Sequence, residues 1–153
     1  MKQEAELCKI VPDCDGMIAK WVCAGLGENT DWIGANVTIG IVHAGELIAG
    51  VIYNDCRPGV DVWMTIYSIS KRWCSRRILK HIFAVAFDVM GCRRVSAFVS
   101  VGNRASKSML ERLGFKREGL LRQYRDNGED CFLFGMLKTE CRWRNKENEQ
   151  IDQ

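Results

Sequence analysis

Basic residues crowd the junction between a predicted strand and a predicted helix, in the stretch Ser70-Lys-Arg-Trp-Cys-Ser-Arg-Arg77. The first turn of a helix presents free backbone amides and a partial positive charge, which repels cations and attracts phosphate. Arg72, Arg76 and Arg77 add permanent charge there, and Ser75 adds a hydroxyl. Because arginine matches phosphate oxygens in bidentate geometry, the stretch predicts a phosphate site more readily than a solvated helix start.

The charge of the chain is concentrated in its middle third. Residues 71–125 carry fourteen cations and three anions, whereas residues 1–70 carry four cations and nine anions, within a formal net charge of +3. A basic segment of this kind suits a polyanion, either a nucleotide-containing cofactor or nucleic acid. A solvated basic face explains the composition equally well, so composition alone does not decide between them.

Length and composition bound the class of protein. The 153 residues are 47% hydrophobic and 27% charged, which is typical of one globular domain. No uncharged apolar run approaches the roughly 20 residues of a membrane span, and the N-terminal residues have no signal-peptide core. We therefore expect one domain over residues 1–140, a polar tail over 141–153, and a cytoplasmic protein.

Eight cysteines invite a disulfide or metal interpretation, which their spacing opposes. They are Cys8, Cys14, Cys23, Cys56, Cys74, Cys92, Cys131 and Cys141. No Cys-x-x-Cys pair occurs, and the histidines are His43 and His81. Because zinc sites usually use closely paired ligands and disulfides belong to secreted domains, we expect reduced thiols and no metal site.

Hydrophobic periodicity predicts a mixture of helices and strands. The predicted order is a helix over 13–26, strands over 36–43, 46–53 and 60–69, a helix over 75–90, a strand over 94–101, a helix over 103–113, and strands over 115–124 and 131–137. The strand–helix–strand unit requires strands 60–69 and 94–101 to be parallel neighbours. One mixed α/β domain of the α+β type follows from this order.

A second stretch of the chain carries a motif that resembles a known family. The motif consists of Asn103, Ser106, Leu113-Gly114-Phe115, Glu118-Gly119 and Arg122. This combination, within residues 90–138, resembles the ribosomal-protein-acetyltransferase-like branch of the GNAT N-acyltransferases, whose element order is similar over residues 10–140. The ending around residues 136–143 is similar to that of small phage-encoded members.

The resemblance implies a GNAT-like acyl-CoA N-acyltransferase fold: a central, mostly antiparallel sheet with a parallel, splayed strand pair and flanking helices. It implies acetyl-CoA, with the pantetheine arm between the splayed strands and the pyrophosphate at the start of helix 75–90. The cofactor-binding residues it implies are Ile69, Ser70, Arg72, Cys74, Ser75, Arg76, Arg77, Asn103 and Ser106. The loop departs from the family pattern, because Cys74 and Arg76 replace glycines that let phosphate approach the backbone.

Acyl transfer from a thioester to an amine needs an oxyanion donor, a base for the amine and an acid for the leaving thiolate. The resemblance implies that a backbone amide near Ile69 or Ser70 meets the oxyanion. Tyr67 and Tyr124 are the candidate acids, with a packing role as the alternative for each.

The base is harder to predict, because residues 65–70 include no carboxylate. Asp61 is a weak candidate, since a place at the start of its strand suits a structural role. Cys74 lies beside cations that lower a thiol pKa, but a cysteine nucleophile paired with His81 is not favoured. We therefore expect direct attack of the amine on the thioester.

The predicted function is an N-acetyltransferase that transfers acetyl from acetyl-CoA to a primary amine in a ternary complex. One alternative is a catalytically silent GNAT-like binding module, which the glycine-free loop favours. Another is a GNAT-like nucleobase-modifying protein that acts on DNA. The expected partners are acetyl-CoA and an amine acceptor, without a membrane and with nucleic acid less favoured, for a monomer or homodimer.

Overall fold

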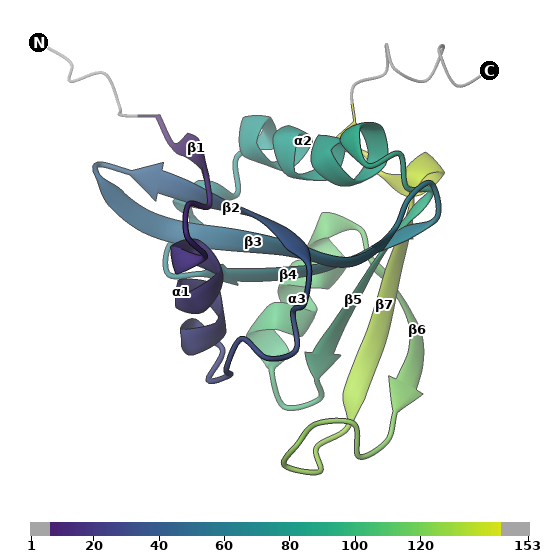
Figure 1. Ribbon diagram of the computed structural model, residues 1–153. Helices are drawn as coiled ribbons and strands as arrows, with labels where there is room; N and C mark the ends of the chain where they lie inside the picture. The colour runs from purple at the N-terminus through teal and green to yellow at the C-terminus, as the bar shows by residue number, and fades with distance from the viewer. Residues whose placement is uncertain (1–6, 145–153) are drawn as a thin grey trace, which may run out of the picture.

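One seven-stranded sheet organises the chain in the computed structural model, which describes residues 7–144. Its strands are β1 (Lys9–Pro12), β2 (Asn36–His43), β3 (Glu46–Arg57), β4 (Asp61–Ser68), β5 (Arg94–Ser100), β6 (Lys116–Leu121) and β7 (Cys131–Leu137). The helices are α1 (Met17–Gly25), α2 (Arg76–Ala84) and α3 (Arg104–Leu113), with short turns η1 (Lys71–Trp73), η2 (Val85–Val89) and η3 (Lys138–Glu140). Figure 1 shows α2 and α1 on opposite faces of the sheet.

The sheet is antiparallel except between β4 and β5, in the order β1-β2-β3-β4-β5-β7-β6. The parallel pairing covers Asp61–Trp63 against Arg94–Ser96, after which the two strands separate. The predicted fold class and the predicted parallel pair are thus confirmed. The separation matters most for function, because it opens the sheet at its centre.

Helix α1 begins later than predicted, at Met17 and not at Asp13. Asp15 and Gly16 adopt positive φ angles of 63° and 72°, which a helix cannot include. Asp13 still caps the helix, because its carboxylate accepts the amides of Ile18 (2.9 Å) and Ala19 (3.0 Å). Asp13 thus lies outside the helix and caps it, so the predicted start at residue 13 is wrong.

The helix predicted over 75–90 consists of two segments. Ser75 is the N-cap of α2, and its Oγ accepts the amide of Ile78 at 3.3 Å. From Val85 the backbone widens into the π-helical turn η2, which ends at Val89. The phenol of Tyr53 in β3 donates to the carbonyl of Ile82 at 2.7 Å, tying the centre of the sheet to α2.

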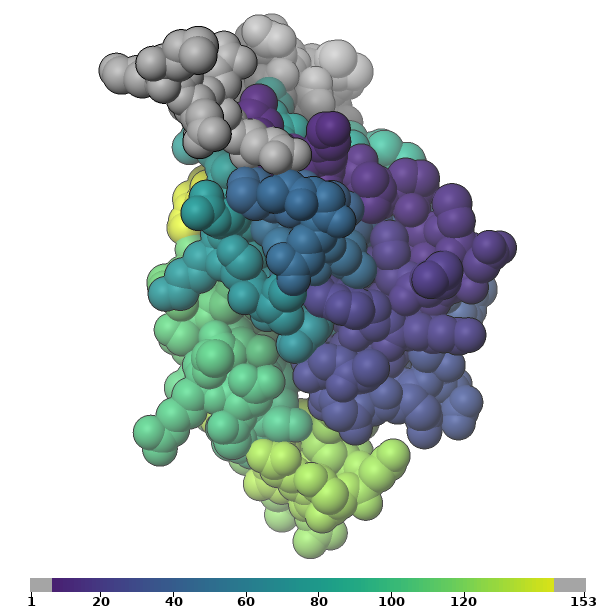
Figure 2. Space-filling view, turned by 90° about the vertical axis from the view of Figure 1, so that its left-hand side faces the viewer, coloured from purple at the N-terminus to yellow at the C-terminus, as the bar shows by residue number. Residues whose placement is uncertain are grey.

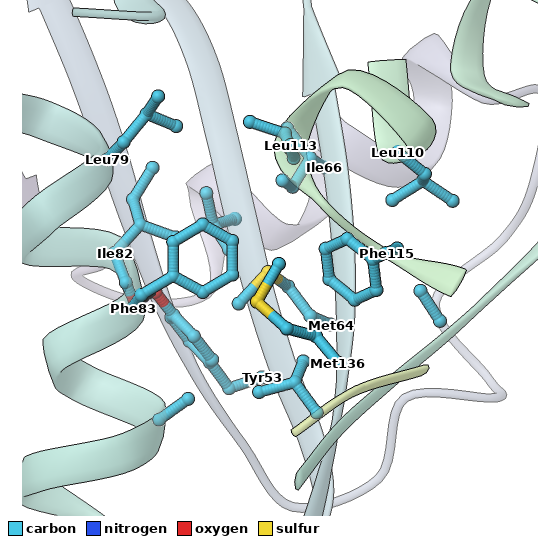
Figure 3. Close-up of a cluster of buried hydrophobic side chains, with 14 of the residues drawn as sticks. Tyr53, Met64, Ile66, Leu79, Ile82, Phe83, Leu110, Leu113, Phe115 and Met136 are labelled. Atoms are coloured by element: carbon cyan, nitrogen blue, oxygen red, sulfur yellow. Dashed lines mark hydrogen bonds between the residues drawn. The ribbon is translucent and has the colours of Figure 1, made fainter. Parts of the chain in front are cut away.

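The main core fills the space between the sheet and the pair α2 and α3. Figure 3 shows Leu79, Ile82 and Phe83 of α2 turned toward Leu110, Leu113 and Phe115, with Met64, Ile66 and Met136 from the sheet between them. A smaller cluster joins α1 to the opposite face, around Val22 and Ile52. Both faces of the sheet are thus covered by helices. The gap between the central strands β4 and β5 is therefore lined by side chains.

Two parts of the structure differ from the prediction at the ends of the chain. The short strand β1 pairs with β2 and was not predicted, because four residues ending in proline show no alternation. At the other end, Cys141 is buried, and the Trp143 indole donates to the Leu113 carbonyl at 2.9 Å. Residues 141–144 of the predicted tail therefore pack on the domain, and residues 145–153 lie outside the described residues.

Within the described part of the chain, no helix is long and apolar enough to cross a membrane.

Candidate functional site

A cavity of about 110 Å³ lies where β4 and β5 separate. Its lining comprises Met64, Thr65 and Ile66 of β4, Ala97, Phe98, Val99 and Ser100 of β5, Asn103, Ser106, Met109 and Leu110 at α3, and Leu26, Glu28 and Arg125 from two loops. Leu110 of α3 packs in the core on the α2 face of the sheet, whereas Leu26 packs in the cluster on the α1 face and Arg125 lies over the Phe98 ring. The cavity therefore takes its lining from both faces of the sheet, at the gap between the two strands.

Backbone groups of β4 face this gap. The Ile69 amide donates to the carbonyl of Ile48 in β3 at 2.9 Å. Because bonded and non-bonded positions alternate along an antiparallel pair, the backbone groups of Met64, Ile66 and Ser68 face away from β3, toward β5. Ile69 therefore has no free amide for an oxyanion, and the amides of Ile66 and Ser68 are the better donors.

Asn103 and Ser106 lie together at the start of α3, in the wall of the cavity. The Asn103 side-chain oxygen accepts the Ser106 amide at 3.1 Å, which caps the helix. This cap leaves the Asn103 amide group and the Ser106 hydroxyl as donors beside the gap. The structure thus brings these two predicted residues to the separated strands.

The basic junction lies outside the cavity lining, at the start of α2. Ser70 Oγ accepts the Arg72 amide at 3.3 Å, and Ser75 caps α2 as described above. Among the described residues, the backbone amides of Arg76 and Arg77 have no recorded partner, as expected for a first helical turn. The junction therefore offers two amides together with three exposed arginine side chains.

Two of these predicted residues carry other contacts. The Arg77 guanidinium donates to the Cys8 carbonyl, and the Cys8 thiol donates to the Arg72 carbonyl at 3.4 Å. Burial raises the pKa of the Cys74 thiol, and the Arg112 guanidinium offsets this only in part. The raised pKa opposes the idea of a Cys74 thiolate nucleophile.

The two predicted tyrosines differ in position. The Tyr67 ring meets the Trp21 ring edge-on, with 5.1 Å between the ring centres, and fills the space beside Gly25. The Tyr67 ring therefore holds α1 on the sheet. Tyr124 is 51% exposed and meets Phe98 edge-on at 5.4 Å. Tyr67 therefore has the packing role left open by the sequence, whereas Tyr124 lies at the site.

Asp61 belongs to a buried polar network at the start of β4. Ser96 Oγ donates to its carboxylate at 2.8 Å, and the Arg94 Nε lies 3.4 Å from the same oxygen. Arg94 in turn binds Glu118 of β6 at 2.7 Å. This network fixes the paired end of β4 and β5, so Asp61 serves structure and not the base role considered for it.

A second cavity, of about 520 Å³, adjoins the first on the α1 side of the sheet. Its lining includes Leu26, Glu28, Phe98, Ser100 and Arg125, which also line the first cavity, and adds Tyr124, Asp126 and Glu129 among others. Glu28 and Arg125 form an ion pair at this junction. Sequence reasoning missed both residues, because one follows α1, the other lies in the β6–β7 loop, and neither belongs to a motif.

The molecule seen from the side at which β4 ends shows how these parts are arranged. In Figure 2, the green segment of α3 lies on one side, and the purple-to-blue segment of α1 and its following loop lies on the other. The yellow-green β6–β7 loop lies below them. The two cavities thus lie among three segments that are distant in the sequence.

Comparisons with known proteins agree on acetyltransferases. No protein-family model matches the sequence. An uncharacterised N-acetyltransferase of Bacillus subtilis, YoaA, is 36% identical over 47 residues, which are 31% of this chain and 27% of that protein. The matched segment therefore spans about a quarter of that relative. The match does not bear on a phage origin, which stays a prediction.

Solved structures match over most of the chain. A crystal structure of a protein assigned as an acetyltransferase has a TM-score of 0.69 and 19% identity, covering 90% of this chain and 89% of that one. A variant of the spermidine N-acetyltransferase SpeG from Vibrio cholerae has a TM-score of 0.67 and 13% identity, covering 86% and 94%. At these identities the likeness is one of fold.

Proposed function

Since the chain has the fold of the GNAT acetyltransferases, we propose that it is an N-acetyltransferase that moves an acetyl group from acetyl-CoA to a primary amine. The observation that carries the proposal is the cavity between the splayed strands, which joins a second cavity on the far face. A thioester entering beside α3 and an amine entering beside α1 would meet there directly. Direct attack in a ternary complex therefore needs no covalent enzyme intermediate.

The residues around the gap suit the charges that develop in this reaction. Acetyl-CoA supplies the activated thioester. The amides of Ile66 and Ser68 face the gap and are suited to the pantetheine arm and the oxyanion. The free donors of Asn103 and Ser106 lie at the opposite wall, and Tyr124 is the remaining candidate acid for the leaving thiolate.

For the pyrophosphate we propose the start of α2, with Arg72, Arg76 and Arg77 and two free amides. The loop residues Ser70, Cys74 and Ser75 complete this segment. Support comes from the exposed guanidinium groups gathered where the helix dipole already disfavours cations.

A catalytically silent binding module is the second candidate, and one feature of the same segment favours it. The Ser75 hydroxyl already caps the Ile78 amide, and Arg77 already binds the Cys8 carbonyl. Both contacts occupy groups that a phosphate would use. A nucleobase acceptor is less favoured, since three carboxylates, of Glu28, Asp126 and Glu129, line the far cavity and repel DNA phosphates. The cytoplasmic location and the oligomeric state stay predictions.

Calorimetric titration with acetyl-CoA separates the two candidates. We expect the wild type to bind, and the double variant R76A/R77A to bind about 100-fold more weakly. Each charge-assisted hydrogen bond contributes roughly 1.5–3 kcal/mol, and about 1.4 kcal/mol is tenfold in affinity. The control K20A/R122A removes two charges from exposed positions elsewhere, on α1 and after β6, and should bind like the wild type.

The outcomes are distinct. A wild type that binds no acetyl-CoA at millimolar concentration supports the silent module. Equal affinity of the wild type and R76A/R77A would instead show that the pyrophosphate lies elsewhere while the acetyltransferase proposal stands.

A further inference from the structure

The Glu28–Arg125 ion pair occupies the point where the two cavities join. Both side chains line both cavities, and they come from opposite walls, the loop after α1 and the loop after β6. Their side chains remain 19% and 26% exposed, respectively, so solvent reaches the pair. A ligand that enters the second cavity on its way to the separated strands must therefore pass these two residues.

The far cavity has an excess of negative charge that only Arg125 offsets within its lining. Its carboxylates belong to Glu28, Asp126 and Glu129. Glu129 is held in place, because its Oε1 accepts the Gly102 amide at 3.0 Å. Glu28 has no comparable backbone partner among the described residues, so the guanidinium is its principal counter-charge.

Arg125 also contacts an aromatic ring of the same cavity. Its guanidinium lies 5.7 Å from the centre of the Phe98 ring, a face that attracts cations. The pair is mostly buried, so Glu28 needs a counter-charge at all times, and only an entering cation can take the place of the guanidinium. The guanidinium is therefore positioned to leave Glu28 and remain within the cavity.

From this arrangement, and resting on the proposed function, we propose that Glu28 binds a positive charge of the acceptor and that Arg125 is its internal substitute, displaced when the acceptor enters. The acceptor class that fits is an aliphatic amine with a second ammonium group. One amine, deprotonated, attacks the thioester, while the other stays charged and binds Glu28. The preference for an acceptor with a second positive charge thus depends on the Glu28 carboxylate and on Arg125, which competes with the acceptor for it.

Three probes with the same four-carbon primary amine test this. Butane-1,4-diamine ends in a second ammonium, butylamine in a methyl group and 4-aminobutyrate in a carboxylate. Each is titrated by calorimetry into the protein with and without coenzyme A, and acetylation by acetyl-CoA is measured in parallel. We expect the diamine to bind at least tenfold tighter than butylamine, and 4-aminobutyrate to bind weakest.

The variants assign this preference to the pair. Glu28→Gln, which keeps the shape and removes the charge, should lose the tenfold preference, because it weakens diamine binding far more than butylamine binding. Arg125→Gln should tighten diamine binding severalfold, because the competitor is gone. Asp31→Asn is the matched control: it removes one carboxylate charge from the same loop, at an exposed residue outside both cavity linings.

Three results would overturn the proposal: equal binding of diamine and butylamine, an intact preference in Glu28→Gln, or tightest binding of 4-aminobutyrate with its loss in Arg125→Gln. The last would make Arg125 an anchor for a carboxylate. Acetyl-CoA titration of the same sample keeps the two proposals apart. If the wild type binds acetyl-CoA without preferring the diamine, only this inference fails, and the titration without coenzyme A decides it even where acetyl-CoA does not bind.

Discussion

Asn103 illustrates at the scale of single residues how one side chain can serve both fold and function. Its oxygen caps α3, and its amide group is left over beside the separated strands. A capping role alone would explain an asparagine at this position. Asn103 differs from an ordinary helix cap because it lies in the cavity wall, which only the tertiary structure shows. Residue identity is thus weak proof of a site until its surroundings are known.

Cys74 leads to a prediction at the same scale. Burial raises the pKa of its thiol, so little thiolate forms at neutral pH, and a thiol is a poor nucleophile. At saturating acetyl-CoA we expect Cys74→Ser to keep kcat within about twofold of the wild type, since direct attack of the amine needs no cysteine. A loss of a hundredfold or more, together with an acetylated wild-type enzyme in intact mass spectra, would contradict direct attack.

The candidate site could be predicted from the sequence only where its residues are neighbours in the chain. Asn103 and Ser106 are three residues apart on one helix turn, so both fall within the short motif on which the family resemblance rests. Glu28 and Arg125 meet on one face of the sheet from two loops that are distant in the sequence, and no spacing rule relates them. The Ile69 amide was a wrong prediction for the oxyanion donor, because it donates to the Ile48 carbonyl. The direction of a strand amide depends on the pairing register, which the sequence does not specify.

Two glycines determine how closely α1 approaches the sheet, at the scale of elements. Gly40 and Gly50 are direct cross-strand partners in β2 and β3. A Cβ atom at Gly50 would lie 2.5 Å from Val22 Cγ2, and one at Gly40 would lie 2.8 Å from Ile18 Cδ1. Helix α1 therefore packs closely on the sheet where these two strands have no side chains. This packing also positions the loop after α1, which includes Glu28, at the site.

We accordingly expect Gly50→Ala to lower the free energy of unfolding by about 1–3 kcal/mol, the usual cost of overpacking a core. Gly119→Ala in β6 is the matched control, because its Cβ would meet nothing within 4 Å. Urea unfolding of both variants and the wild type measures the difference. Equal stability of the two variants would mean that α1 is not tightly seated on the sheet.

Elements were predictable to the extent that their periodicity is local. β7 has the predicted bounds, since its alternation and the preceding turn define both ends. The widening of the helix at Val85 escaped prediction, because an apolar run gives no signal that separates a π-helical turn from an α-helix. The central separation of β4 and β5 followed from the family resemblance and not from periodicity.

The whole molecule has its charges divided between the two faces of the sheet. α2 and α3, which share one face, carry Arg76, Arg77, Arg104, Lys107 and Arg112 among their residues. On the other face, beside α1, the far cavity is lined by three carboxylates and one arginine. The formal net charge of +3 therefore hides two local fields of opposite sign. An anionic cofactor and a cationic acceptor would each approach a complementary face.

This division predicts how salt affects the two ligands. Raising salt from 0.1 M to 1 M shortens the Debye length from about 10 Å to about 3 Å, which screens partly exposed charges. We expect acetyl-CoA and butane-1,4-diamine both to bind more weakly, because each meets a local field of opposite sign. If only the net charge of +3 mattered, salt would weaken acetyl-CoA binding but tighten diamine binding by screening a repulsion. Calorimetry at the two salt concentrations distinguishes these cases, with butylamine as the reference for a single positive charge, and tighter diamine binding at 1 M would contradict an acidic acceptor face.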